Sequence, residues 1–141
     1  MSKHSQSLDE SSRGAVHNRA CAKQLRDFTG LRWGTITPTD IDGFMDFKDQ
    51  LFVWMEAKFK EEPLGGGQRL AFQRTCDAVA ETGRESIVLV LSHDRPPEED
   101  IPFASLLVRE FRYDGRWHVP QKPITCREAI DAMLQKAGIM L

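Results

Sequence analysis

Four charged residues lie near the open end of a predicted apolar hairpin, DIDGFMDFKDQLFVWMEAK, which covers residues 40–58. They are Asp40, Asp42, Glu56 and Lys58. A strand built to be buried rarely carries charges that have no partner. Carboxylates are ligands of hard divalent cations, and a lysine beside them can act on a bound water or offset charge on a phosphate. These residue types indicate metal-dependent hydrolysis of a phosphodiester.

The spacing of the charges fits one hairpin register. If residues 48–50 form a three-residue loop, Phe47 pairs with Leu51. The two pairs of charged residues that then face each other are Asp42 with Glu56, and Asp40 with Lys58. A loop of two or four residues would break these pairs.

Two carboxylates placed directly opposite each other need a neutralising partner. Facing side chains on an antiparallel pair have Cβ atoms about 5 Å apart, so Asp42 and Glu56 repel unless one takes up a proton or a cation lies between them. Mg²⁺ commonly uses only one or two protein carboxylates, together with water and substrate phosphate. The plain alternative is a surface salt-bridge cluster at the frayed end of a hairpin.

Periodicity and turn signals predict eight elements in the order α-β-β-α-β-β-β-α. The succession of strand, helix and strand in the middle implies a parallel pair, so we expect a mixed α/β sheet with helices packed on it. The predicted segments are a helix at 12–28, a hairpin whose second strand is 51–59, a helix at 68–82, a buried strand at 86–92, a hairpin at 104–120 that turns at Asp114–Gly115, and a helix at 125–138 capped by Thr125 and Glu128.

Length and composition indicate one globular domain. The chain has 141 residues, is 40% hydrophobic and 28% charged, and has a net charge of −2. We expect a disordered tail at residues 1–10 and a single domain at 11–141. Three dispersed cysteines argue against a zinc site or a disulfide framework. No apolar run is long enough for a membrane span or a signal peptide, so the expected location is the cytoplasm, with no membrane partner.

An aspartate followed by a strand pair and Glu-x-Lys resembles the pattern of the PD-(D/E)XK nuclease superfamily. Here PTDID (38–42) supplies the acid and FVWMEAK (52–58) supplies Glu-x-Lys. The resemblance covers residues 11 to about 92 and is closest to small resolvase-like nucleases of phages and prophages. It implies a restriction-endonuclease-like core with a mixed central sheet flanked by helices.

The resemblance also implies roles for individual residues. Asp42 and Glu56 would bind Mg²⁺ or Mn²⁺, helped by the backbone carbonyl of Ala57. Lys58 would be the catalytic lysine. Gln68, at the start of a helix, would orient the attacking water or contact the DNA backbone, although a solvent-facing helix residue is the plain alternative for it.

One departure from the family pattern leaves two candidates for the first acid. The family proline usually stands directly before the aspartate, whereas Pro38 precedes Asp40 by two residues and Asp42 by four. Asp42 is preferred because the simplest loop places it opposite Glu56. Asp40 points to the same side and would be an outer-shell or second-metal ligand, or the main ligand if the hairpin slips by two residues.

The predicted function is therefore that of a magnesium-dependent DNA nuclease, with structure-selective cleavage of branched or junction DNA as the subtype implied by the resemblance. DNA is the expected partner, and a homodimer would explain cleavage of two strands. The alternative is a catalytically silent module of the same fold that binds nucleic acid or a partner protein, for example as a phage counter-defence factor. The modest net charge argues against tight non-specific DNA binding.

Overall fold

The computed structural model describes residues 25–141. The chain divides after Pro38 into two compact units. In the described part of the first unit, residues 25–38, one isolated antiparallel bridge joins Trp33 and Ile36.

The predicted helix at 12–28 is wrong at its C-terminal end, because residues 25–28 are not helical. The Asp27 carboxylate accepts the backbone N–H of Thr29 at 2.9 Å. This local bond offers the backbone an alternative to the helical hydrogen bond. The rest of that helix, and the tail predicted at 1–10, lie outside the described residues.

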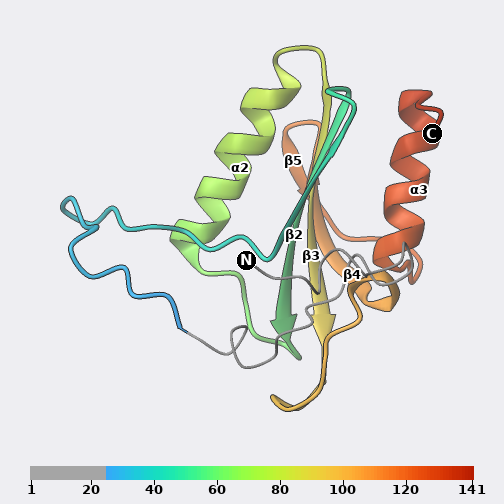
Figure 1. Ribbon diagram of the computed structural model, residues 1–141. Coiled ribbons are helices and arrows are strands. Elements are labelled where there is room, and N and C mark those ends of the chain that lie inside the picture. Colours follow the sequence, from blue (N-terminus) through green and yellow to red (C-terminus); the bar gives the residue numbers. More distant parts are fainter. Residues whose placement is uncertain (1–24) are drawn as a thin grey trace, which may run out of the picture. The chain divides into compact units, whose positions relative to one another are not determined.

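The second unit, Thr39–Leu141, is a five-stranded mixed sheet between two helices (Figure 1). Strands β2 and β3 are parallel and the other neighbours are antiparallel, as the strand–helix–strand succession predicted. The strands, which lie in sequence order across the sheet, are β1 (Gly43–Phe47), β2 (Leu51–Phe59), β3 (Glu85–His93), β4 (Leu107–Tyr113) and β5 (Arg116–His118).

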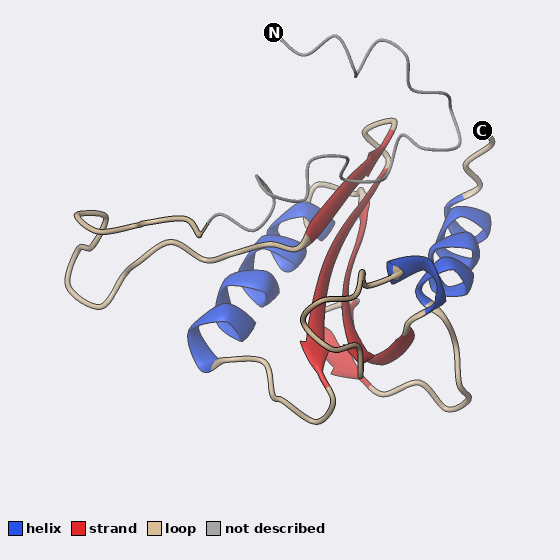
Figure 2. Ribbon diagram, turned by 60° about the horizontal axis from the view of Figure 1, so that its bottom comes forward, coloured by secondary structure: helices blue, strands red, loops and turns tan. Residues whose placement is uncertain are grey.

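Helices α2 (Gly66–Ala80) and α3 (Cys126–Ala137) cover opposite faces of this sheet (Figure 2). Strand β3 is buried along most of its length, as predicted, because both of its faces are covered. Leu89 and Leu91 belong to the core on the α3 side, whereas Val88 and Val90 belong to the core on the α2 side.

Local turn and cap chemistry appears where it was predicted. The Thr125 hydroxyl accepts the N–H of Glu128 at 3.1 Å, and the Glu128 carboxylate accepts the N–H of Thr125 at 2.9 Å, so α3 begins with a capping box. Asp114 and Gly115, with φ of 54° and 76°, form the turn between β4 and β5.

The predicted strand before that turn is too long at its beginning. Residues Phe103–Ser105 form a short 3₁₀ turn (η3), in which the Ser105 N–H donates to the carbonyl of Pro102 at 3.1 Å. Strand β4 starts only at Leu107.

In the part of the chain that the structure describes, no helix is long and apolar enough to cross a membrane.

Candidate active site

The hairpin of β1 and β2 has the predicted register. Phe47 pairs with Leu51, and the ladder continues to Gly43 opposite Met55. The turn is closed by the Gln50 N–H, which donates to the carbonyl of Phe47 at 3.0 Å. Lys48 and Asp49 have φ of 55° and 61°, the left-handed pair that a tight hairpin turn requires.

This register brings the two predicted carboxylates together just beyond the last ladder pair. The Asp42 N–H donates to Glu56 Oε1 at 3.3 Å, and the Ala57 N–H donates to Asp42 Oδ2 at 2.8 Å. Each carboxylate is thus hydrogen-bonded to the backbone of the opposite segment. In an extended strand, the N–H and C=O of one residue point toward the same side. The carbonyl of Ala57 is therefore directed to the side on which Asp42 lies.

Helix α2 adds an amide to this pair. Gln68 Nε2 donates to Glu56 Oε2 at 2.8 Å and is 3.4 Å from the backbone carbonyl oxygen of Asp40. The loop before α2 is anchored by Leu64, which is buried in the same core cluster as Phe72 of the helix. This packing holds the first turn of α2, and hence Gln68, beside the end of β2.

Lys58 also belongs to the cluster, but its acidic partners differ from the predicted one. Its ammonium nitrogen lies 3.7 Å from Glu56 Oε2 and 3.9 Å from a carboxylate oxygen of Glu62. The predicted cross-strand pair of Asp40 and Lys58 is wrong, because the ladder begins only at Gly43. Glu62, which the sequence reasoning missed, follows the turn that begins after β2, and its N–H donates to the carbonyl of Phe59 at 3.0 Å.

Glu56 carries a buried carboxyl group that lies next to a second carboxylate. Glu56 is only 5% exposed, which is unusual for a glutamate. It pairs in the parallel ladder with Val90, which is fully buried. Burial raises the pKa of Glu56 and the nearby Asp42 carboxylate raises it further, while the Gln68 amide and the Lys58 ammonium oppose the shift. The site therefore favours a positive charge placed next to Glu56.

The donor set at this point suits a hard divalent cation. Asp42 and Glu56 offer carboxylate oxygens and Ala57 offers a carbonyl, all from backbone positions that the hairpin fixes. No group of three or more His, Cys, Asp and Glu side chains that could hold a metal ion is found in residues 25–141.

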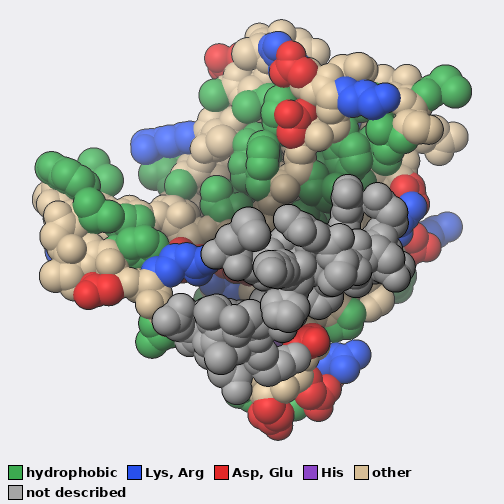
Figure 3. Space-filling model, viewed as in Figure 1, with side chains coloured by type: hydrophobic (Ala, Val, Ile, Leu, Met, Phe, Trp, Pro, Cys, Tyr) green, Lys and Arg blue, Asp and Glu red, His purple; other side chains and the backbone are tan. Residues whose placement is uncertain are grey.

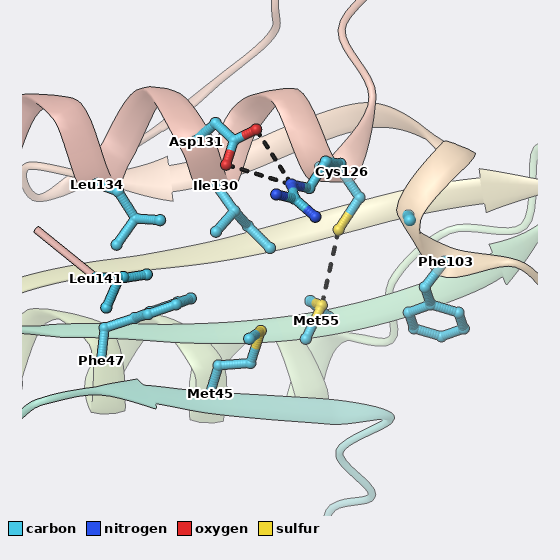
Figure 4. A pocket seen from close by; sticks show the side chains of 11 residues that line it. Met45, Phe47, Met55, Phe103, Cys126, Ile130, Asp131, Leu134 and Leu141 are labelled. Carbon is cyan, nitrogen blue, oxygen red and sulfur yellow. Dashed lines mark hydrogen bonds and ion pairs between the residues drawn. The ribbon is translucent and has the colours of Figure 1, made fainter. Parts of the chain in front are cut away.

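Two other features lie apart from this cluster. The His93 ring packs edge-on against Phe59, and its Nδ1 accepts the Arg95 N–H at 3.1 Å, so it has a local structural role. An apolar pocket of about 490 Å³ lies under α3 (Figure 4). Its wall includes Met55, whose side chain points to the sheet face opposite that of Glu56, since successive strand residues alternate.

Sequence reasoning missed an aromatic residue beside the site. Phe44 follows Asp42 by two residues in the hairpin, and the alternation of strand side chains would have placed both on one face. The signal was therefore available in the parity of β1, which the sequence reasoning applied only to β2.

No family model, no curated protein and no solved structure matches this chain.

Proposed function

We propose that this protein is a metal-dependent DNA nuclease of the PD-(D/E)XK type that hydrolyses phosphodiester bonds. The observation that carries the proposal is the convergence of four side chains from the hairpin and α2 at one point: Asp42, Glu56, Lys58 and Gln68. Two carboxylates that share a position with an ammonium and an amide are the groups that hydrolysis of a phosphodiester needs.

Each side chain has a role that follows from its contacts. Asp42 and Glu56 would hold Mg²⁺ or Mn²⁺, which when bound polarises the scissile phosphate and a water ligand. Gln68 holds the Glu56 carboxylate in place through the 2.8 Å bond to Oε2. The Lys58 ammonium is close enough to offset negative charge that develops on the phosphate. A cytoplasmic location, a homodimeric state and a preference for branched DNA stay predictions.

The test is cleavage by the purified full chain. Linear, supercoiled and branched DNA are incubated with the protein in Mg²⁺, in Mn²⁺ and in EDTA. We expect cleavage only with a divalent cation, and a loss of about two orders of magnitude or more in rate for Glu56→Ala and for Lys58→Ala. The matched control is Glu61→Ala, which removes an exposed acid in the adjacent loop and should leave the rate unchanged.

Cleavage that survives both substitutions would contradict the site assignment. If the wild-type protein cuts none of the substrates with either metal, the alternative gains support, in which the chain is a catalytically silent module that binds nucleic acid or a partner protein. Thermal unfolding of each variant, followed by circular dichroism, separates loss of the site from loss of the fold.

A further inference from the structure

Three aromatic rings lie on the side of the hairpin that carries the candidate site. Phe44 of β1 pairs in the ladder with Trp54 of β2, and their ring centroids are 5.3 Å apart. The Phe44 ring also stacks with that of Phe52, at 6.0 Å and an interplanar angle of 21°. Phe44 thus rests on two other rings, which fix its position.

The outermost of these rings is open to solvent. Trp54 is 6% exposed, whereas Phe44 is 50% exposed. Phe44 stands on β1, which is an edge strand of the sheet. Edge strands are usually protected by charged side chains, and a half-exposed phenylalanine there leaves an apolar surface uncovered. Figure 3 shows hydrophobic side chains gathered on both sides of this hairpin.

The exposed ring of Phe44 lies near the two carboxylates of the candidate site. Phe44 and Asp42 are two residues apart in the sequence, and Asp42 lies at the bend directly before β1. Trp54, the ladder partner of Phe44, is two residues from Glu56 on the same face of β2, which corresponds to about 7 Å along the strand. A base attached to the sugar next to a phosphate at the carboxylates is therefore within reach of the ring.

We propose that Phe44 is a base-stacking residue, which makes the site selective for nucleic acid whose bases are unpaired next to the scissile phosphate. In a continuous duplex the faces of each base are covered by its neighbours, so the ring has nothing to stack on. At a single-stranded stretch or a branch a base face is free, and aromatic side chains bind such faces with little regard to sequence. This inference deepens the proposed nuclease function and rests on it.

The experiment compares one sequence in two forms, single-stranded and fully paired. Phe44→Leu keeps an apolar side chain against Trp54 but removes the aromatic face, whereas Phe44→Trp keeps such a face. We expect Phe44→Leu to lower kcat/KM on the single strand by about 5-fold or more, the lower end for one stacked base, and to leave the duplex rate unchanged. Phe44→Trp should restore the single-strand rate.

The matched control is Phe59→Leu, because Phe59 is 43% exposed on the adjacent strand β2 but points to the other face. It should change neither rate. A second readout is independent of cleavage: 2-aminopurine fluorescence in a single-stranded oligonucleotide in EDTA should be quenched by wild type and Phe44→Trp, and much less by Phe44→Leu.

The outcomes separate this inference from the nuclease proposal. If wild type and Phe44→Leu cleave the single strand equally and quench 2-aminopurine equally, Phe44 is not a stacking residue, while the nuclease proposal stands. If no DNA is cleaved but quenching still requires an aromatic side chain at position 44, the stacking site stands and the nuclease proposal fails.

Discussion

At the scale of single residues, the candidate site centres on Glu56. Its carboxylate is buried, lies beside the Asp42 carboxylate, and is compensated by one amide, one backbone N–H and one ammonium. Burial of a charge costs stability unless partners replace water. Burial and the Asp42 carboxylate outweigh this compensation, so the pKa of Glu56 is raised. This arrangement supports the cation site that we propose.

The raised pKa of Glu56 predicts how stability depends on pH. Below its ordinary pKa the carboxyl is protonated in both the folded and the unfolded chain, so its contribution is fully present there. As pH rises through the raised pKa of the folded state, the group must ionise in a buried place, and stability is lost. We expect Glu56→Gln to remove this loss, since its amide stays neutral.

The measurement is the free energy of unfolding in urea, with EDTA present, from about pH 4 to about pH 8. Wild type should lose stability relative to Glu56→Gln as pH rises, and Glu56→Gln should be the more stable variant at the upper end. Parallel curves for the two proteins would contradict the raised pKa that we assign to Glu56.

At the scale of elements, the turn between β1 and β2 decides which side chains meet. Lys48 and Asp49 both have positive φ, and neither is a glycine. Asp49 is held by an ion pair with Arg84, at 2.9 Å, and by a hydrogen bond from its N–H to the Asp46 carboxylate at 2.8 Å. The register that aligns Asp42 with Glu56 therefore depends on a turn that its own residue types support only in part.

Substitutions at Lys48 test this turn. Its φ of 55° suits asparagine and strongly disfavours a β-branched residue. We expect Lys48→Asn to raise the free energy of unfolding by several tenths of a kcal/mol and Lys48→Val to lower it by about 1–2 kcal/mol. Urea unfolding measures both, and the pair serves as its own control because each variant loses the lysine charge. Equal stability of the two variants would show that the turn does not hold the left-handed conformation.

At the scale of the whole second unit, one sheet separates two hydrophobic cores, and the candidate site lies on the side of only one of them. The α2 side carries the candidate site at its edge, and the α3 side is closed by a helix with strong caps. Strand β3 joins the two cores, since its alternate residues enter each of them. The two sides should therefore unfold together, while only the α2 side affects the chemistry.

Leu89→Ala tests this separation. Leu89 is 1% exposed in the core on the α3 side, so the truncation should cost about 2–5 kcal/mol and lower Tm in a single transition. The rate of DNA cleavage per folded molecule should stay within about 2-fold, because the site lies on the other face. Leu107→Ala, at a residue 51% exposed on β4, is the matched control and should cost much less. Selective loss of cleavage without loss of stability would contradict the separation.

Much of the fold was predictable from local sequence. The buried run 86–92 marked β3, Thr125 and Glu128 marked the start of α3, and Asp114–Gly115 marked a hairpin. In each case the signal lies within a few residues. The prediction was wrong for residues 25–28, where an Asp27 side-chain bond replaces the helical one, and at the start of the strand before β4.

Strand alternation and turn length are local properties, and they predicted from sequence that Asp42 meets Glu56 if the turn has three residues; the structure brings the two residues together. Only the tertiary structure decided how deeply Glu56 is buried, that Gln68 donates to its carboxylate, and that Lys58 lies between Glu56 and Glu62. These depend on how α2 packs on the sheet, and packing between distant segments is not written in the spacing of neighbouring residues. The position of β1 at the edge of the sheet leaves Phe44 the most exposed ring of its cluster.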